Sequence, residues 1–141
     1  MLAATVAGAG GCVTVAYDGP RLPASEVATI EAGEVHIDQI DGRDVRDKSQ
    51  KFEVRPGDHI LAVRLQARRG YYFVTKYFSS RDAMWFCVRA LPKHYYVLGA
   101  QVGATWWAPI IYDGSSDVTV LSCSPDSVGG APTPLIMPGG G

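Results

Sequence analysis

The stretch Lys51-Phe-Glu-Val-Arg-Pro-Gly-Asp-His-Ile-Leu-Ala-Val-Arg-Leu-Gln-Ala67 decides the fold, because it contains two strands and the turn that joins them. Apolar and polar side chains alternate along residues 59–67, which is typical of a strand with one buried face. Between the strands, Pro56 presets its own φ and Gly57 can adopt a positive φ, so both suit a turn. The stretch therefore predicts a β-hairpin.

Short runs of the same kind lie on both sides of this hairpin. They are rich in β-branched and aromatic residues and are separated by turn signals such as Asp41-Gly42. Closely spaced strands without a helical period predict an all-β fold, a single, mainly antiparallel β-sandwich. Pro109 has no N–H to donate, which predicts that its strand lies at a sheet edge or is bulged. The predicted strands are residues 27–31, 35–40, 51–54, 59–67, 71–78, 84–90, 95–98, 106–111 and 118–121.

The 141 residues of the chain suit one domain with two flanking segments. Residues 1–12 resemble the end of a truncated lipoprotein signal, residues 13–25 are expected to be an extended tether, and residues 26–121 are the predicted sandwich. Residues 122–141 are rich in Ser, Pro and Gly and have too little apolar content to offset the entropy of ordering. We therefore expect both termini to be disordered.

Cys12 closes a run of small residues, Ala9-Gly10-Gly11, of the kind that a lipoprotein signal peptidase requires before its cysteine. A basic region and a long apolar region are missing, which is explained if the true start codon lies upstream. We predict that Cys12 carries diacylglycerol; the alternative is a Gly/Ala-rich N-terminus whose cysteine has no such role. Because Val13 rather than Asp follows, a Gram-negative host would sort the protein to its outer membrane, facing the periplasm.

Charge and hydropathy argue against two classes of function. The chain has 13 Lys and Arg against 14 Asp and Glu, interleaved along the sequence, so no strong basic footprint for nucleic acid is present. The sequence has no run of about 18 apolar residues, so it predicts no transmembrane helix. Membrane attachment is therefore expected to come from lipid on Cys12.

Cys87 and Cys123 remain once Cys12 is assigned to lipid. An even pair in a compartment that permits disulfides can form one. Alternatively, Cys87 is an ordinary buried thiol in its apolar strand and Cys123 a residue of the tail. Sequence supplies no geometry, so both interpretations stay open.

No group of residues specifies a reaction. His36, His59 and His94 lie on three separate predicted strands, without the close paired spacing of a zinc site. No serine lies in a Gly-x-Ser-x-Gly elbow, and Cys87 lacks the exposed, electropositive surroundings of a thiolate nucleophile. We therefore predict no catalytic residue, no metal site, no cofactor and no enzymatic activity.

Aromatic residues are in surplus in the second half of the chain. Adjacent residues point to opposite faces of a strand, so adjacent aromatic pairs cannot all be core unless both faces are covered. The predicted binding surface consists of Tyr72, Tyr95, Trp106 and Trp107. Exposed Tyr and Trp can stack on sugars or form the hot spot of a protein interface, and the alternative is two-sheet core packing.

Several of these segments, taken in order, resemble PEGA-type β-domains. The similarity is carried by the Asp41-Gly42 turn, by Pro56-Gly-Asp-His59 and by Gly70-Tyr71. Together with Cys12 and Trp107-Ala-Pro-Ile-Ile-Tyr-Asp113, the order is similar to that of small uncharacterised bacterial lipoproteins. The resemblance implies an immunoglobulin-like β-domain that faces the periplasm, binds other envelope components and has no catalytic residues.

The predicted function is that of a non-enzymatic lipoprotein of the bacterial cell envelope, which presents a β-domain to an envelope protein or to peptidoglycan. The alternatives are an envelope hydrolase, an inhibitor of such a hydrolase, or a purely structural envelope protein. A hydrolase predicts a concave polar pocket in which histidine and carboxylates converge, whereas an interaction domain predicts a flat or edge-strand surface.

Overall fold

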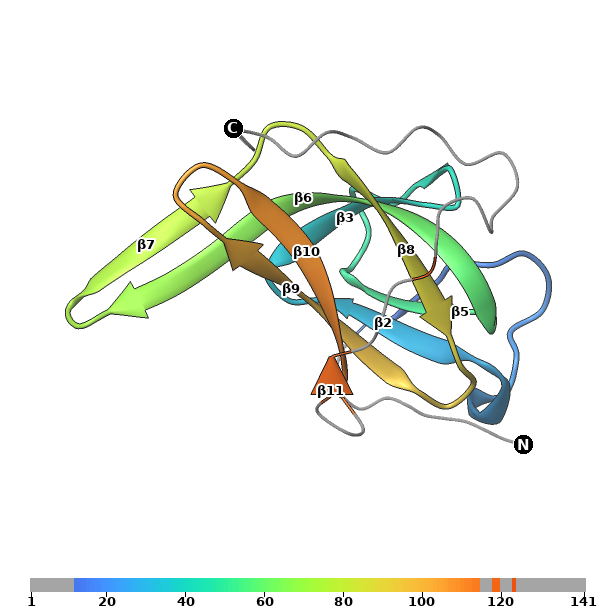
Figure 1. Cartoon of the computed structure of the whole chain (residues 1–141). Coiled ribbons are helices and arrows are strands. Elements are labelled where there is room, and N and C mark those ends of the chain that lie inside the picture. The colour runs from blue at the N-terminus through green and yellow to red at the C-terminus, as the bar shows by residue number, and fades with distance from the viewer. Residues whose placement is uncertain (1–11, 115–117, 120–122, 124–141) are drawn as a thin grey trace.

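A computed structural model describes residues 12–114, 118, 119 and 123, and it confirms an all-β fold of two sheets packed against each other (Figure 1). One short turn of 3-10 helix, η1 (Ala24–Glu26), precedes the second strand. The strands are β1 (Thr14–Val15), β2 (Ala28–Ala32), β3 (Val35–Ile40), β4 (Arg43–Asp44), β5 (Lys51–Val54), β6 (Gly57–Tyr71), β7 (Val74–Ser79), β8 (Met84–Ala90), β9 (Tyr95–Val102), β10 (Trp107–Asp113) and β11 (Val118–Thr119).

The first sheet has the strand order β1-β5-β2-β9-β10-β11. The second sheet has the order β4-β3-β6-β7, and β8 also pairs with β6. Most described pairs are antiparallel, as predicted, but β1–β5 and β2–β9 are parallel. Parallel pairing is available to these strands because each pair is formed by segments far apart in the chain rather than by a short hairpin.

The hydrophobic core lies between the sheets, and alternation along the strands decides which side chains enter it. Phe52 and Val54 of β5 are fully buried, as are Leu61 and Val63 of β6. The side chains that form the core come from strands of both sheets. Burial of one alternating face of each strand therefore holds the two sheets together. Other core side chains include Ile30, Ile37, Ile40, Val45, Val88, Tyr96, Leu98 and Ile111.

The segment that the sequence predicts to be a tether is bound to the sandwich instead. β1 lies inside residues 13–25 and pairs with β5. The Leu22 N–H donates to the Tyr17 hydroxyl at 2.9 Å, and Arg43 Nη2 lies 2.6 Å from Asp18 Oδ1. The sandwich therefore begins before residue 26, because even a two-residue strand gains backbone hydrogen bonds from an open sheet edge. Apart from Cys12 and Cys123, the expected signal and tail, residues 1–12 and 122–141, lie outside the described residues.

β10, the strand that carries Pro109, lies between β9 and β11 in the sheet order and pairs with β9 without a register shift, so the prediction of an edge or bulged strand is wrong for the strand as a whole. Pro109 pairs with Ala100 of β9 on one side. On the other side β11 reaches only Tyr112 and Asp113, so no described strand lies beside Pro109 there. At Pro109 itself, therefore, only β9 among the described strands needs backbone hydrogen bonds from β10, which limits the cost of the missing N–H.

A hairpin projects from the sandwich (Figure 1). The first half of β6 pairs with β3 and β8, whereas from Gln66 onward its described partner is β7. We call residues 66–79 the arm and the other described residues the body. The sequence predicts one strand over residues 71–78, but the chain turns tightly at Tyr72 and Phe73, since Tyr71 pairs with Val74.

Candidate functional site

The four aromatic residues predicted as one binding surface lie in different surroundings. Trp107 is buried in the core, so the prediction is wrong at this residue. Tyr95 is half-buried, and its hydroxyl donates to the carboxylate of Glu31. Tyr72 at the tip of the arm and Trp106 in the turn between β9 and β10 are exposed. Neighbours such as Trp106 and Trp107 differ because adjacent residues point to opposite sides of the chain.

An open cleft of about 310 Å³ lies at the root of the arm. Its lining comes from the loop after β7, which includes Arg81 and Asp82, and from the turn that carries Trp106. The Trp106 indole packs against Gly103, where a Cβ would collide with Nε1, and the Gly103 N–H donates to the Trp106 carbonyl at 2.8 Å. Trp106 is thus held in place while 39% of its surface stays exposed.

The charged side chains of this cleft have no partner among the residues that the structure describes. Arg81 and Asp82 are exposed, and neither side chain makes a hydrogen bond or ion pair within the described part of the chain. The loop itself is fixed, because Ser80 Oγ accepts from the Leu65 N–H at 2.9 Å and donates to the Asp82 carbonyl at 3.1 Å. The cleft therefore offers a fixed aromatic ring, a guanidinium donor and a carboxylate acceptor to a polar ligand.

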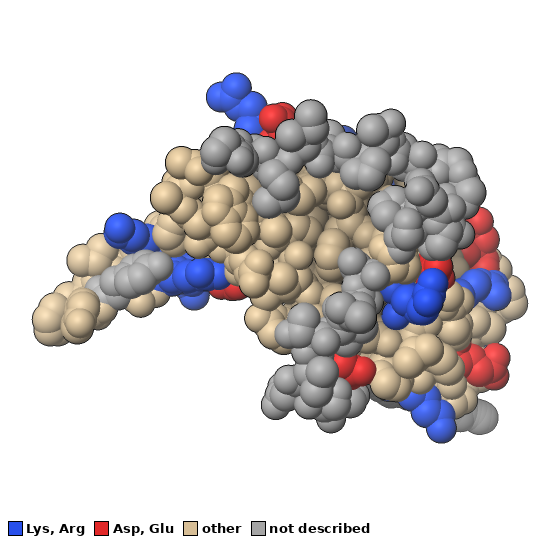
Figure 2. Space-filling view, viewed as in Figure 1, with Lys and Arg blue, Asp and Glu red and all other residues tan. Residues whose placement is uncertain are grey.

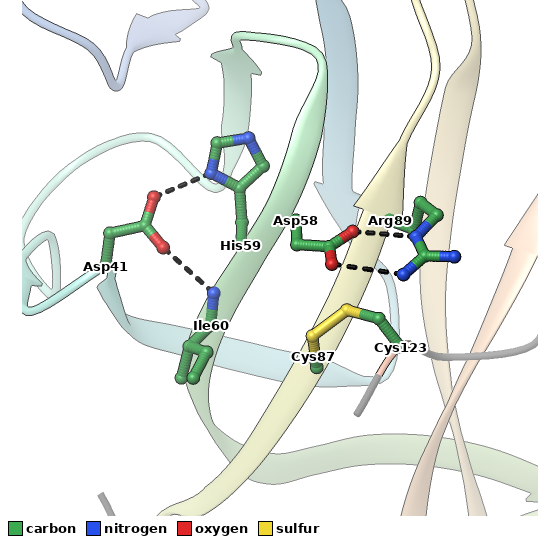
Figure 3. The surroundings of a disulfide bond; sticks show 7 residues. All are labelled: Asp41, Asp58, His59, Ile60, Cys87, Arg89 and Cys123. Atoms are coloured by element: carbon green, nitrogen blue, oxygen red, sulfur yellow. Dashed lines mark hydrogen bonds and ion pairs between the residues drawn. A yellow bond between two sulfur atoms is a disulfide. The ribbon is translucent and has the colours of Figure 1, made fainter. Parts of the chain in front are cut away.

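A second polar cluster joins two turns of the body (Figure 3). His59 Nδ1 lies 2.6 Å from Asp41 Oδ2, and the Ile60 N–H donates to Asp41 Oδ1 at 2.9 Å. His59 Nε2 lies 2.6 Å from the Arg55 carbonyl oxygen. Both ring nitrogens are occupied, so this histidine links the turn before β6 to the turn after β3.

This pairing shifts the pKa of both groups. Burial is the largest single influence on each and opposes its charge, but the hydrogen bonds and the attraction between the partners outweigh burial. The pKa of His59 is therefore raised above its usual value, and the pKa of Asp41 is lowered. The charged pair is favoured over a wide range of mildly acidic to neutral pH.

The other histidines lie apart from this pair. His94 Nδ1 is 2.5 Å from Asp113 Oδ2, and His36 Nε2 is 3.0 Å from the Arg46 carbonyl oxygen. No described serine or cysteine side chain is hydrogen-bonded to a histidine ring, so the described residues show no nucleophile–base pair. Residues 12–114, 118, 119 and 123 contain no group of three His, Cys, Asp or Glu that could hold a metal ion.

The cysteines divide as one pair and one exposed thiol. Cys87 of β8 forms a disulfide with Cys123, with 5.1 Å between the Cα atoms (Figure 3). Beside this bond, Arg89 Nε donates to Asp58 Oδ1 at 2.8 Å. Cys12 is exposed with a free thiol, and its carbonyl accepts from Ser49 Oγ at 3.2 Å.

Comparisons of the chain with protein-family models, curated proteins and solved structures give no match. The resemblance to PEGA-type domains and the lipid on Cys12 therefore stay predictions. Within the described residues, no helix has the length and apolar content needed to cross a membrane.

Sequence reasoning missed Phe73, Arg81 and Asp82. The sequence places Phe73 inside a predicted strand, because the tight turn that contains it lacks Gly, Asn, Asp and Pro. Arg81 and Asp82 belong to the polar run Ser79-Ser-Arg-Asp82, which indicates a loop and nothing more. Their position beside Trp106 follows from the sheet topology, which no local pattern specifies.

Proposed function

We propose that the protein is a non-enzymatic lipoprotein of the bacterial cell envelope, anchored by lipid on Cys12, whose body binds cell-wall glycan in the Trp106 cleft. One observation carries this proposal. The ring of Trp106 is fixed against Gly103 and lines the same open cleft as Arg81 and Asp82, whose side chains have no partner in the described part of the chain.

This combination matches the chemistry of a sugar. A pyranose ring has an apolar face that packs on an aromatic ring, and hydroxyl groups that need donors and acceptors. Arg81 supplies donors and Asp82 acceptors, and neither has to give up a described partner in order to bind. Because Trp106 is already fixed, binding loses less side-chain entropy than it would at a mobile ring.

The surroundings of Cys12 support the anchor. The thiol is exposed and free, and the residue lies two positions before β1, at the edge of the body. A lipid attached here would extend into solvent or membrane without displacing a core side chain. Outer-membrane attachment in a Gram-negative host remains part of this proposal, on the argument from Val13.

Co-sedimentation with insoluble peptidoglycan tests the cleft. Trp106→Ala should weaken binding about tenfold or more, the effect of truncating an aromatic hot spot. Tyr112→Ala is the matched control, because Tyr112 is 38% exposed, packs against Gly99 and lies at the far end of β10. We expect this variant to bind like the wild type. Equal binding by Trp106→Ala and the wild type, or no binding by the wild type, would contradict the glycan proposal.

Intact mass and membrane fractionation test the anchor. The gene, expressed with its upstream DNA, should give a diacylated protein in the membrane fraction, and Cys12→Ser should give a soluble one. A soluble, unmodified wild type would contradict lipidation.

A further inference from the structure

The outer part of the arm exposes apolar side chains that no described residue covers. Tyr72 and Phe73 at the tip are fully exposed, and Val74 and Tyr77 on β7 are 58% and 75% exposed. Figure 2 shows the arm extending from the body, with uncharged residues at its end and basic residues behind them. Apolar groups concentrated on such a projection indicate a contact surface rather than chance exposure.

The backbone at the tip supports this interpretation. Tyr72 has φ of 53°, a left-handed conformation that is unfavourable for a residue with a bulky side chain. A two-residue hairpin turn with a positive φ at its first position usually has Gly there. Strained residues of this kind are concentrated at binding and functional sites. Tyr72 thus occupies a position where Gly would be more stable, and the residue beside it, Phe73, is another large, fully exposed aromatic.

The charge of the arm has one sign. Residues 66–79 include Arg68, Arg69 and Lys76 and no Asp or Glu, although the chain as a whole has more acidic than basic residues. Arg68 and Lys76 are exposed. They lie four and three residues behind the tip, which corresponds to roughly 10–14 Å along a strand.

The root of the arm is fixed to the body. Arg69 donates to both carboxylate oxygens of Glu34 at 3.0 Å and to the Ala100 carbonyl at 2.7 Å. Glu34 also accepts from the Ala100 N–H at 3.2 Å. Ala67 is buried and Phe78 packs against the core. These contacts join the arm to β9 of the opposite sheet, so the tip is presented in a defined direction.

We propose that the arm binds the surface of an anionic lipid bilayer, with the rings of Tyr72 and Phe73 in the headgroup region. Interfacial segments place their apolar side chains roughly 5–10 Å below the surface, and Tyr is enriched at that depth. The spacing along the arm then brings Arg68 and Lys76 to the level of the lipid phosphates. A protein hot spot would instead have its rings at the centre of a flat surface with a polar rim.

The position of Cys12 agrees with this orientation. Its carbonyl accepts from Ser49, and the next residue, Gln50, accepts from the N–H of Ala32. Glu34 lies two residues after Ala32, and its carbonyl accepts from the N–H of Gln66 at the root of the arm. Cys12 and the arm therefore lie at the same end of the body. The bilayer contact is nevertheless separate from the glycan cleft and does not depend on lipidation.

Vesicle co-sedimentation tests the proposal with the full chain carrying Cys12→Ser, which removes any contribution from an acyl chain. The vesicles contain either phosphatidylcholine alone or equal parts phosphatidylcholine and phosphatidylglycerol. We expect binding to the anionic vesicles that weakens as salt is added. Adding Tyr72→Ser and Phe73→Ser should weaken this binding about tenfold or more, whereas the matched surface control Tyr112→Ser should leave it unchanged.

A charge variant keeps the tip and tests the basic residues separately. Arg68→Gln with Lys76→Gln should weaken binding to anionic vesicles about fivefold per charge and reduce its salt dependence. Thermal unfolding should show that all variants are folded, since the substituted side chains are exposed. The proposal is overturned if the Cys12→Ser protein fails to bind anionic vesicles at low salt, which would leave the tip as a protein contact. It is also overturned if the tip variants bind as well as their parent, or if both vesicle types bind equally.

Discussion

Two hairpin turns, one in the body and one at the tip of the arm, join their strands with two residues each. In the body, Asp41 and Gly42 have φ of 51° and 82°, the conformation that Asp-Gly adopts most readily in a hairpin. In the arm, Tyr72 has φ of 53° without the conformational freedom of Gly. We expect the body turn to stabilise the fold and the arm turn to lower its stability; the arm turn also exposes two rings.

The difference extends beyond the turns. Asp41 also binds His59 and the Ile60 N–H, so one turn residue connects several parts of the body. In the arm, by contrast, Arg69 contacts Glu34 of the body, but residues 72–77 are all exposed. The sequence of the outer arm is therefore explained by the proposed contact with a bilayer. The sequence of the body is explained by the packing of its own core.

The largest expected effect contrasts two phenylalanines. Phe52→Ala should lower the free energy of unfolding by about 3–5 kcal/mol, because a fully buried ring leaves a cavity. Phe73→Ala should change it by less than about 0.5 kcal/mol, because the ring is fully exposed. Urea unfolding of both variants and of the wild type measures these changes in the free energy of unfolding. A large loss in Phe73→Ala would mean that the arm packs on something within the chain and would break the comparison.

Removing the disulfide should affect the body alone. Replacing Cys87 and Cys123 by Ala opens a link between residues 36 positions apart, and about 2–5 kcal/mol of stability should be lost. The outer amides of β7 should exchange hydrogen at unchanged rates, because they open locally rather than by global unfolding. Hydrogen exchange followed by mass spectrometry measures both the loss of global stability and the exchange rates of the β7 amides. Faster exchange in β7 would show that the arm depends on the disulfide.

The Asp41–His59 pair predicts a pH dependence confined to the body. The raised pKa of His59 means that its contribution is complete below its unfolded value of about 6.5 and is lost as pH rises through the higher folded value. The lowered pKa of Asp41 means that its contribution is present above its unfolded value of about 3.9 and is lost as pH falls through the lower folded value. The pair should therefore stabilise most between these limits.

Thermal unfolding of the wild type and Asp41→Ala across this range measures the pair. The variant should lose about 1–3 kcal/mol at mildly acidic pH, the cost of leaving buried partners unsatisfied. The difference between the two proteins should shrink above neutral pH. A difference that does not vary with pH would contradict the assigned pairing. The outer arm should contribute no pH dependence of stability over this range, because residues 66–79 contain no His, Asp or Glu.

The sequence predicts the body well and the arm poorly, for a physical reason. Alternation and turn residues marked most strands and the Asp41-Gly42 turn, because there local preference and tertiary structure agree. The turn at Tyr72 could not be predicted, since aromatic and β-branched residues on both sides favour a continuous strand. The cleft was found in part: Trp106 was named, but its separation from buried Trp107 required the register of β9 and β10.

The most direct test of the account is one variant with two readouts. Tyr72→Gly with Phe73→Asn gives the arm a turn sequence suited to its backbone. The account predicts that the free energy of unfolding does not fall and rises by up to about 1 kcal/mol, as strain at Tyr72 is relieved. It also predicts that the same variant, carrying Cys12→Ser so that no acyl chain contributes, binds phosphatidylglycerol vesicles about tenfold more weakly than its Cys12→Ser parent. A less stable protein, or one that binds the vesicles as well as its parent, would contradict the claim that the residues at the tip lower stability and provide a membrane contact.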